Sequence, residues 1–327
     1  MSSEDHLPLL LVNGDDVDEL ATVDVALAAA EDAARLVAGG SIVTGRVQVN
    51  GPVAWMRLLA GMVSDLDVLG YKEFHRVDKR VRYHIHLFRG STGDPIGIVD
   101  GRRITSLRTA ATATAAVRRW AGSDPKVVGL IGSGEESREG LRALAGAIDV
   151  SEAVVFSPTP ANRAAFASEM TDELELDIRA VASQQEVTGG CEVLYVATSS
   201  HHEAFLDARA LDGVGFVAAI GSTQPVHREL VGDVFTAAAK VVLDTPDAAE
   251  ESGDCIEGAE YGWDPKQAVL LGDYLGEQPD DEPGYTLFKS IGSVEQDLVL
   301  AYRLVEEAQR RSKGTTVNDV ASLRTMR

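Results

Sequence analysis

The stretch VVGLIGSGEES, residues 127–137, has the clearest chemical meaning in this sequence. An apolar run leads into Gly132-Ser133-Gly134, and a charged sequence of helical character follows. A glycine turn between a strand and a helix presents backbone N–H groups at the positive end of the helix, where phosphates bind. Gly132 would permit the tight turn, Gly134 the approach of a pyrophosphate, and Ser137 is small enough to replace the usual third glycine. Such a turn can be purely structural, but the alternating strands and helices around it favour dinucleotide binding.

The end of the next expected strand indicates which dinucleotide binds. NAD sites usually carry an acid there, about 20 residues beyond the glycines, which accepts hydrogen bonds from the ribose 2′-hydroxyl. This sequence instead has VVFSPTPANR, with Ser157, Thr159 and Arg163 and no carboxylate. These side chains favour NADP, with NAD as the alternative, although Arg163 could equally be a solvated helix residue. Further cofactor contacts are expected from Thr109, Ser133, Glu135, Thr198, Ser199, Gly221 and Ser222.

The spacing of apolar residues divides the chain into two kinds of structure. Residues 15–36 indicate two helices, and an antiparallel sheet and a helix follow, with the strands expected at 46–50, 55–63, 81–90 and 95–101 and the helix at 105–122. Beyond Asp124-Pro125, helices alternate with continuous apolar runs typical of a parallel sheet covered on both faces, at 126–132, 153–157, 193–199, 215–222 and 240–245.

An amphipathic helix is expected over residues 294–311, and the polar tail after Gly314 is expected to be loose. The simplest architecture is α/β: a doubly wound Rossmann domain, residues 121–292, inserted into a split α+β domain. The split domain would consist of residues 1–120 plus 293–327.

Composition excludes several classes of partner. The 327 residues carry a net charge of −21, which argues against binding to nucleic acid or to an anionic membrane surface. No stretch approaches the roughly 18 apolar residues of a membrane span, and the amino terminus lacks a signal-peptide pattern, so a cytoplasmic location is expected. With two cysteines, and no third ligand near His201 and His202, neither a disulfide framework nor a metal site is expected.

Five segments resemble the ornithine cyclodeaminase/μ-crystallin family, in the family's order: ITSLRTAATATAA, VVGLIGSGEES, AAIGSTQPVHREL, VVLDTPDAAEESGD and TLFKSIGSVEQDLVLA. The resemblance covers nearly the whole chain, and Arg-Thr-Ala-Ala before a Rossmann glycine turn is fairly specific to this family. It implies a homodimer, a nicotinamide cofactor, and a split domain that carries the substrate site and the dimer contacts. Members act on a carbon that bears nitrogen next to a carboxylate.

The resemblance also assigns three cations, Arg46, Lys72 and Arg108, to the substrate carboxylate. A guanidinium offers two parallel donors to a carboxylate, whereas an ammonium offers a point charge and a transferable proton. Lys72 is therefore expected to be catalytic as well. His84 and His86 alternate in YHIHLF and so share one face of a strand, from which they could line the substrate site as acid or base.

Two positions depart from the ornithine cyclodeaminases of this family. Thr223 stands where their catalytic aspartate lies, and WMRLLAG has no clear counterpart of their catalytic glutamate. The sequence therefore favours NAD(P)-dependent reduction of a small imino acid or ketimine, or oxidation of the corresponding amino acid, as in alanine-dehydrogenase-like and opine-type enzymes. The alternatives are cyclodeamination of ornithine to proline plus ammonia, and a μ-crystallin-like protein that binds NADPH without turnover.

The acidic excess also predicts how the protein responds to salt. Asp and Glu number 51 against 30 Lys and Arg, a balance that suits a halophilic cytoplasm. Because molar salt screens the mutual repulsion of surface carboxylates, thermal stability should rise from low to molar potassium chloride. Melting temperatures that stay flat or fall over this range would contradict a halophilic origin.

Overall fold

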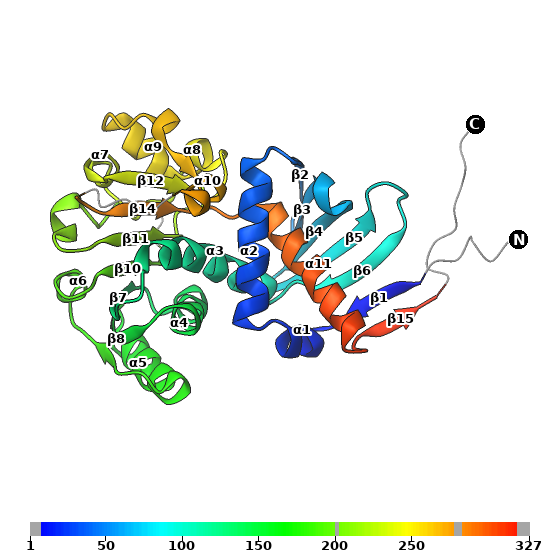
Figure 1. Cartoon of the computed structure of the whole chain (residues 1–327), viewed down its shortest axis with the longest axis horizontal. Coiled ribbons are helices and arrows are strands. Elements are labelled where there is room, and N and C mark those ends of the chain that lie inside the picture. Colours follow the sequence, from blue (N-terminus) through cyan, green and yellow to red (C-terminus); the bar gives the residue numbers. More distant parts are fainter. Residues whose placement is uncertain (1–7, 200–202, 278–282, 319–327) are drawn as a thin grey trace, which may run out of the picture. The chain divides into compact units, whose positions relative to one another are not determined.

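The computed structural model describes residues 8–199, 203–277 and 283–318, and the chain forms two compact units. Unit 1 comprises residues 1–108 and 293–327, and unit 2 comprises residues 109–292 (Figure 1). The first boundary falls inside helix α3 (Ile104–Ala121), earlier than residue 120, and the second falls between Gly292 and Ser293. Unit 2 is thus inserted between the two segments of unit 1. Among the described residues, no helix has the length and apolar character needed to cross a bilayer.

Unit 1 contains a seven-stranded sheet of order β15-β1-β6-β5-β4-β3-β2. Its strands are β1 (Leu9–Val12), β2 (Ile42–Asn50), β3 (Ala54–Val63), β4 (Val68–Val77), β5 (Arg80–Arg89), β6 (Pro95–Asp100) and β15 (Thr315–Val317). A short 3-10 helix, η1 (Ser64–Leu66), joins β3 to β4. Neighbouring strands are antiparallel except β1 and β6, which are parallel.

Three of these strands were absent from the expected pattern. The segment after Gly314, expected to be loose, forms β15 because its backbone pairs with β1. β4 escapes detection because the side of the strand that faces the core carries Gly70 and Lys72, which break the alternation of apolar and polar residues. β1 has only four residues, too few to show a period.

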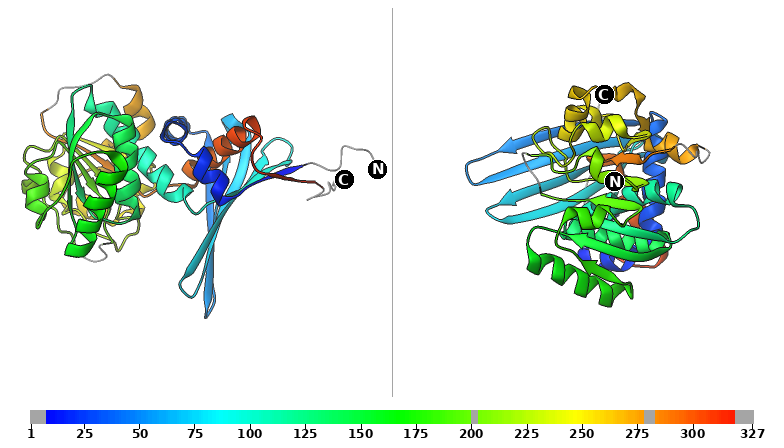
Figure 2. Two further views of the ribbon diagram at one scale, coloured as in Figure 1. Left: turned by 90° about the horizontal axis from the view of Figure 1, so that it is seen from below. Right: turned by 90° about the vertical axis from the view of Figure 1, so that its left-hand side faces the viewer.

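Three helices complete unit 1: α1 (Gly14–Leu20), α2 (Val23–Ala38) and α11 (Val294–Arg310). Helix α11 packs on β3, β4, β5 and β6, and α2 packs on α11 (Figures 1 and 2). We call the side of the sheet that α11 covers the helix face. The other side, which includes Tyr71, Glu73, His84 and His86, we call the opposite face.

A row of glycines lets α11 approach the sheet. Gly61 and Gly70 are directly paired, and Gly97 continues the same row two strands further on. A Cβ on Gly70 would lie 2.8 Å from the Leu298 side chain, and one on Gly97 would lie 3.0 Å from Val305. Both distances are too short for carbon atoms, so the lack of a side chain at these glycines determines how closely α11 lies on the sheet.

Unit 2 contains an eight-stranded, entirely parallel sheet of order β13-β12-β14-β11-β10-β7-β8-β9. Its strands are β7 (Lys126–Ile131), β8 (Val150–Phe156), β9 (Ile178–Ala180), β10 (Val193–Val196), β11 (Phe216–Ala219), β12 (Lys240–Leu243), β13 (Val269–Leu270) and β14 (Thr286–Lys289). The five expected strands are present; β9, β13 and β14 are additional.

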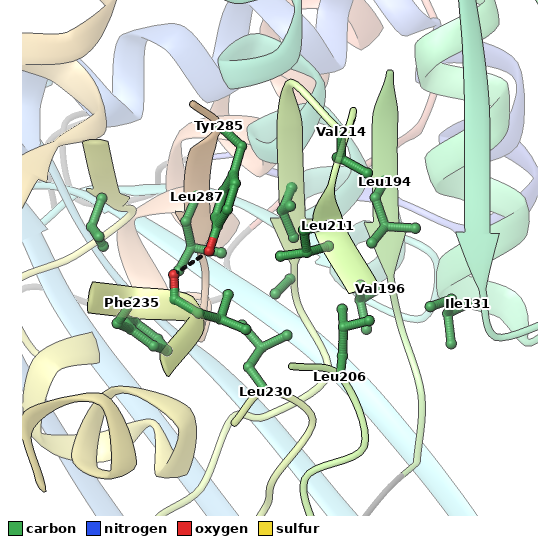
Figure 3. Close-up of a cluster of buried hydrophobic side chains, with 14 of the residues drawn as sticks. Ile131, Leu194, Val196, Leu206, Leu211, Val214, Leu230, Phe235, Tyr285 and Leu287 are labelled. Carbon is green, nitrogen blue, oxygen red and sulfur yellow. Dashed lines mark hydrogen bonds between the residues drawn. The ribbon is translucent and has the colours of Figure 1, made fainter. Parts of the chain in front are cut away.

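Helices connect these strands, as a doubly wound fold requires. They are α4 (Glu135–Ala147), α5 (Pro160–Leu174), α6 (Gln184–Thr188), α7 (Asp233–Ala237), α8 (Ala248–Glu251), α9 (Gly253–Glu260) and α10 (Leu271–Gly276), with 3-10 turns η2 (Ala208–Leu211) and η3 (Pro265–Gln267). Figure 3 shows part of the core on one side of the sheet, where Leu194, Val196 and Leu287 pack with residues of the connecting segments. The buried Tyr285 hydroxyl donates to the Val234 carbonyl at 2.6 Å, so this polar group keeps a partner inside the core.

Candidate functional site

The glycine turn lies where the strand order of unit 2 reverses. β7 has β8 on one side and β10 on the other, and in such sheets ligands bind at the carboxyl ends of the strands beside this switch point. Gly132 follows β7 with a φ of +119°, and a Cβ there would overlap the carbonyl oxygen of Ala197. Only glycine fits. Ser137 is fully buried, and its Oγ would lie 3.1 Å from that same Cβ, so the small side chain is needed for close packing.

The turn also has the geometry needed to bind an anion. Gly134 is the N-cap of α4, and a Cβ built on it would meet nothing within 4 Å, so its backbone is approachable. Glu135 begins the helix and is exposed, and the first N–H groups of α4 have no partner within the helix. The residues present therefore fit a pyrophosphate at this helix end.

The end of β8 gathers the three residues expected to distinguish NADP from NAD. The Ser133 hydroxyl donates to the Ser157 hydroxyl at 2.9 Å, which ties the glycine turn to the second strand. Arg163 donates to the carbonyl of Ser157 at 2.8 Å, and its guanidinium lies 5.7 Å from the centre of the Phe156 ring. Thr159 is exposed at the N-cap of α5. A cation held by a carbonyl and a ring, with no carboxylate beside it in the sequence SPTP, suits an additional phosphate.

Glu229 joins the next two loops, and the sequence reasoning missed it. Its Oε1 accepts from the Thr198 backbone N–H and hydroxyl, both at 2.7 Å, and its Oε2 accepts from the N–H groups of Gly221 (2.8 Å) and Ser222 (3.2 Å). All three partners are expected cofactor residues. Ser199, also expected, is exposed beyond Thr198. In the sequence the HREL segment that contains Glu229 resembles an ordinary charged loop, because nothing local shows that a carboxylate will be fully buried.

The charge of Glu229 depends on its buried surroundings. Burial raises the pKa of Glu229 to about 7, with a smaller contribution from Asp254, while the nearby Lys289 ammonium acts to lower it. Asp254 accepts from the Glu229 backbone N–H at 2.8 Å and lies 3.2 Å from the Lys289 ammonium. Asp254 and Lys289 are both fully buried. Because the four groups bonded to Glu229 all donate, protonation near neutral pH would remove an acceptor from these loops.

In unit 1, the expected catalytic lysine forms a buried ion pair. Lys72 is 3% exposed, and its Nζ lies 3.0 and 3.1 Å from the two carboxylate oxygens of Asp297 and 2.9 Å from the Thr105 hydroxyl. Asp297 belongs to the first turn of α11, 225 residues further along the chain. The sequence did not reveal Asp297, because acids in the first turn of a helix are common for the helix dipole alone.

Arg108 is placed beside the same carboxylate. Its Nε lies 3.5 Å from Asp297, and its Nη1 donates to Gln296 at 3.1 Å. Asp297 therefore holds both Lys72 and Arg108. Gln296 is a second residue that sequence reasoning did not identify.

Strand register places the third expected cation on the same face of the sheet. Arg46 pairs with Leu59 on β3, and Leu59 pairs with Lys72 on β4. Directly opposed residues point to the same face. Arg46 and Lys72 thus share the helix face, roughly 10 Å apart at their Cα atoms, two strand spacings. Arg46 is exposed and Lys72 is buried.

The two expected histidines are not brought together with these cations. His84 and His86 pair with Glu73 and Tyr71, on the opposite face of the sheet from Lys72. There His84 lies 2.7 Å from Glu73, and His86 stacks on Tyr71 with ring centres 4.6 Å apart. The alternation of the sequence placed both histidines on one face but could not tell which face. Because that face is opposite the three cations, the structure does not support the histidines' expected substrate role.

The remaining expectations concern Thr223, which replaces the cyclodeaminase aspartate, and the expected lack of a metal site. Thr223 is exposed just after β11. Within the described ranges, no group of three or more His, Cys, Asp and Glu residues could hold a metal ion. His201 and His202 lie outside the described residues.

The chain is similar to known proteins over most of its length. The sequence matches the ornithine cyclodeaminase/mu-crystallin family over residues 70–313. A Δ1-pyrroline-2-carboxylate reductase of Bacillus cereus is 25% identical over 280 residues, 80% of this chain and 83% of the reductase. An alanine dehydrogenase of Archaeoglobus fulgidus is 26% identical over 327 residues, 94% of this chain and 98% of the dehydrogenase. The structure of a Thermococcus litoralis Δ1-pyrroline-2-carboxylate reductase with NADH and L-proline has a TM-score of 0.85 and 25% identity, covering 94% of this chain and 100% of that one.

The chain belongs to the ornithine cyclodeaminase/mu-crystallin family. The family and the α/β fold class expected from the sequence are confirmed. The relatives that match most of its length include a reductase and a dehydrogenase, and the Thermococcus litoralis reductase is solved in complex with NADH.

The buried ion pair leads to a prediction about stability and turnover. Lys72→Met removes the ammonium that faces both oxygens of the buried Asp297 carboxylate, leaving the more distant Arg108 Nε beside it, and should lower the free energy of unfolding by about 3–5 kcal/mol. Adding Asp297→Asn should restore much of that loss, as measured by chemical denaturation.

Turnover should respond differently from stability. If Lys72 contacts the substrate carboxylate, kcat/KM should fall by roughly 30-fold to a few thousandfold in both variants, from about 2–5 kcal/mol of lost interaction. Fluorescence titration should show unchanged dinucleotide affinity. Recovery of kcat/KM in the double variant would mean that Lys72 is only structural.

Proposed function

We propose that this protein is an NAD(P)-dependent oxidoreductase that reduces a small imino acid or ketimine, or oxidises the corresponding amino acid. The observation that carries the proposal is the Lys72–Asp297 pair with Arg108 beside it, a buried cationic cluster in unit 1. The glycine turn of unit 2, which fits a pyrophosphate, and the reductase and dehydrogenase relatives support it. Unit 1 is then the substrate-binding unit and unit 2 the dinucleotide-binding unit.

The proposed roles follow from the chemistry of each side chain. A bound nicotinamide supplies or accepts the hydride. Arg108 and Arg46 hold the substrate carboxylate, Arg108 from a position fixed by Gln296 and Asp297. Asp297 faces the buried Lys72 ammonium with both carboxylate oxygens and so provides a counter-charge for it. When one of these contacts is exchanged for substrate, the Lys72 ammonium can donate a proton to the reduced nitrogen, completing the addition of hydride and proton across the C=N bond.

Ornithine cyclodeamination fits this chain less well. Thr223 occupies the position of the cyclodeaminase aspartate, and a hydroxyl cannot replace a carboxylate base. A protein that binds NADPH without turnover is the remaining alternative, and the same assay tests it.

Cofactor absorbance at 340 nm separates the three functions. The protein should oxidise NADPH or NADH with cyclic imino acids or with α-keto acids plus amines, and should reduce NADP or NAD with the matching amino acid. Ornithine converted to proline without change in the cofactor would indicate a cyclodeaminase. Binding of the cofactor with no reaction across the whole panel would indicate a binding protein.

We further propose that NADP is preferred to NAD, because Ser157, Thr159 and Arg163 occupy the place of the usual acid. Arg163→Gln should weaken NADPH binding by about tenfold to a hundredfold and leave NADH binding nearly unchanged, the range expected for one charge-assisted contact. Arg179→Gln, at an exposed arginine of β9 that pairs with Glu152 of β8, serves as the control. Tighter binding of NADH by the unmodified protein would show that the preference is for NAD.

We also propose that two copies pair through the opposite face of the unit 1 sheet. This face exposes large apolar side chains that a monomer would leave in water: Val43, Val47, Val49, Met56, Leu69 and Val77, between 40% and 70% exposed. A second copy offers the same surface, as a two-fold interface requires.

Light scattering tests this pairing. The unmodified protein should have the mass of a dimer, and Val47→Asp or Leu69→Asp should give monomers because a carboxylate would be buried at the interface. Val81→Asp changes an exposed valine on the helix face and should leave the mass unchanged. A monomer in the unmodified protein would refute the proposal.

A further inference from the structure

A further arginine, Arg57, lies on the helix face beside Arg46 and Lys72. Arg57 pairs with Gln48 on β2 and with Phe74 on β4, one row beyond Leu59 and Lys72 along the strands. Diagonal neighbours on adjacent strands lie about 7–8 Å apart, so Arg57 is within one such step of both Arg46 and Lys72. The family resemblance assigned no role to Arg57.

The Arg57 guanidinium is held in place by neutral partners. Its Nε and Nη2 donate to the Gln48 side-chain oxygen at 2.9 and 2.6 Å, and the Gln48 amide nitrogen donates to Asn50 at 2.9 Å. Within the part of the chain that the structure describes, no carboxylate forms an ion pair with Arg57. In the chain as a whole acids outnumber bases, 51 to 30, and many arginines pair with a carboxylate. Arg57 lies on the helix face without such a carboxylate partner among the described residues.

An aromatic wall connects Arg57 to Lys72. The Phe74 ring packs edge-on against Trp55 and stacks on Tyr83, with ring centres 5.4 Å apart in both cases. Lys72 Nζ lies 5.8 Å from the centre of the Phe74 ring, and the Arg57 Cζ lies 5.6 Å from it. The two cations are therefore no farther apart than the sum of these distances, a span suited to the two ends of a short molecule. Apolar walls strengthen the attraction between the cations and an anion by excluding water.

We propose that Arg57, with its orientation fixed by Gln48, binds a second carboxylate of the substrate. This inference rests on the proposed function, in which Arg108 and Arg46 hold the carboxylate next to the reacting carbon and Lys72 supplies the proton. The preferred substrates would then be the imino forms of four- or five-carbon dicarboxylic acids, or the matching amino acids. The guanidinium can give a carboxylate two donors, and without that anion three cations on one face would repel one another.

Steady-state kinetics on chemically matched pairs tests the proposal. The unmodified protein should oxidise aspartate or glutamate with kcat/KM at least tenfold higher than alanine or 2-aminobutyrate. Arg57→Met should lower kcat/KM for the dicarboxylic amino acids by about tenfold to a hundredfold and change the values for the others by less than twofold. Arg310→Met, at an exposed arginine at the end of α11 that pairs with Glu307, should change neither. Equal losses for both classes would show that Arg57 is structural and would overturn the proposal, as would a preference for monocarboxylic substrates.

A binding measurement keeps this test independent of catalysis. Calorimetry should show that succinate binds at least tenfold more tightly than butyrate, and that Arg57→Met removes the difference. If the protein turns over no substrate but retains this difference, the proposed oxidoreductase function fails while the carboxylate subsite stands. Equal affinities in the unmodified protein, or a difference that survives Arg57→Met, would refute the subsite.

Discussion

The ion pair between Lys72 and Asp297 places the strongest constraint on unit 1. Two charges taken out of water are tolerated only when each faces the other with good geometry, and removing either one leaves an isolated buried charge. The two residues lie 225 positions apart, in the two separate segments of unit 1, so the pair forms only when α11 has returned to the sheet. The return of the chain, the docking of α11 on the sheet and the arrangement of the site residues therefore depend on one another in this unit.

The glycine row makes that docking feasible. Gly61, Gly70 and Gly97 leave room for Leu298 and Val305, so α11 lies close enough for its first turn to reach Lys72. One turn of helix is enough to orient the site, because Gln296 and Asp297 position Arg108 and Lys72 together. Unit 2 uses the same device with Glu229, a single buried carboxylate that fixes the loops after two strands. In both units the residues expected to touch ligand are positioned by acids that the sequence did not reveal.

Much of the fold could be predicted from local patterns. The glycine turn with Gly132 and the nearby Ser137, the five apolar strands expected in unit 2, and the last helix all have signals that lie within a few residues. Strands with weak patterns could not be found this way: β4 carries a glycine and a lysine where apolar residues would normally lie, and β14 owes its central position to pairing with β11 and β12.

The candidate site was predictable only in part, for a related reason. Family resemblance led to Lys72 and Arg108, and alternation put His84 and His86 on a common face. Which face that was, and which acids would be buried against the cations, depend on register and on contacts between distant segments. Arg57 illustrates the same limit, because its position beside Lys72 follows from the pairing of three strands.

The central claim is that this chain moves a hydride between a nicotinamide and a carbon that bears nitrogen. The most direct measurement uses NADPH or NADH carrying deuterium at the transferable position of C4, incubated with the most active imino acid, with the product examined by mass spectrometry and NMR. The account predicts one deuterium on the carbon next to the carboxylate of the amino acid product, in equal amount to the cofactor oxidised. An amino acid product without deuterium at that carbon would contradict it.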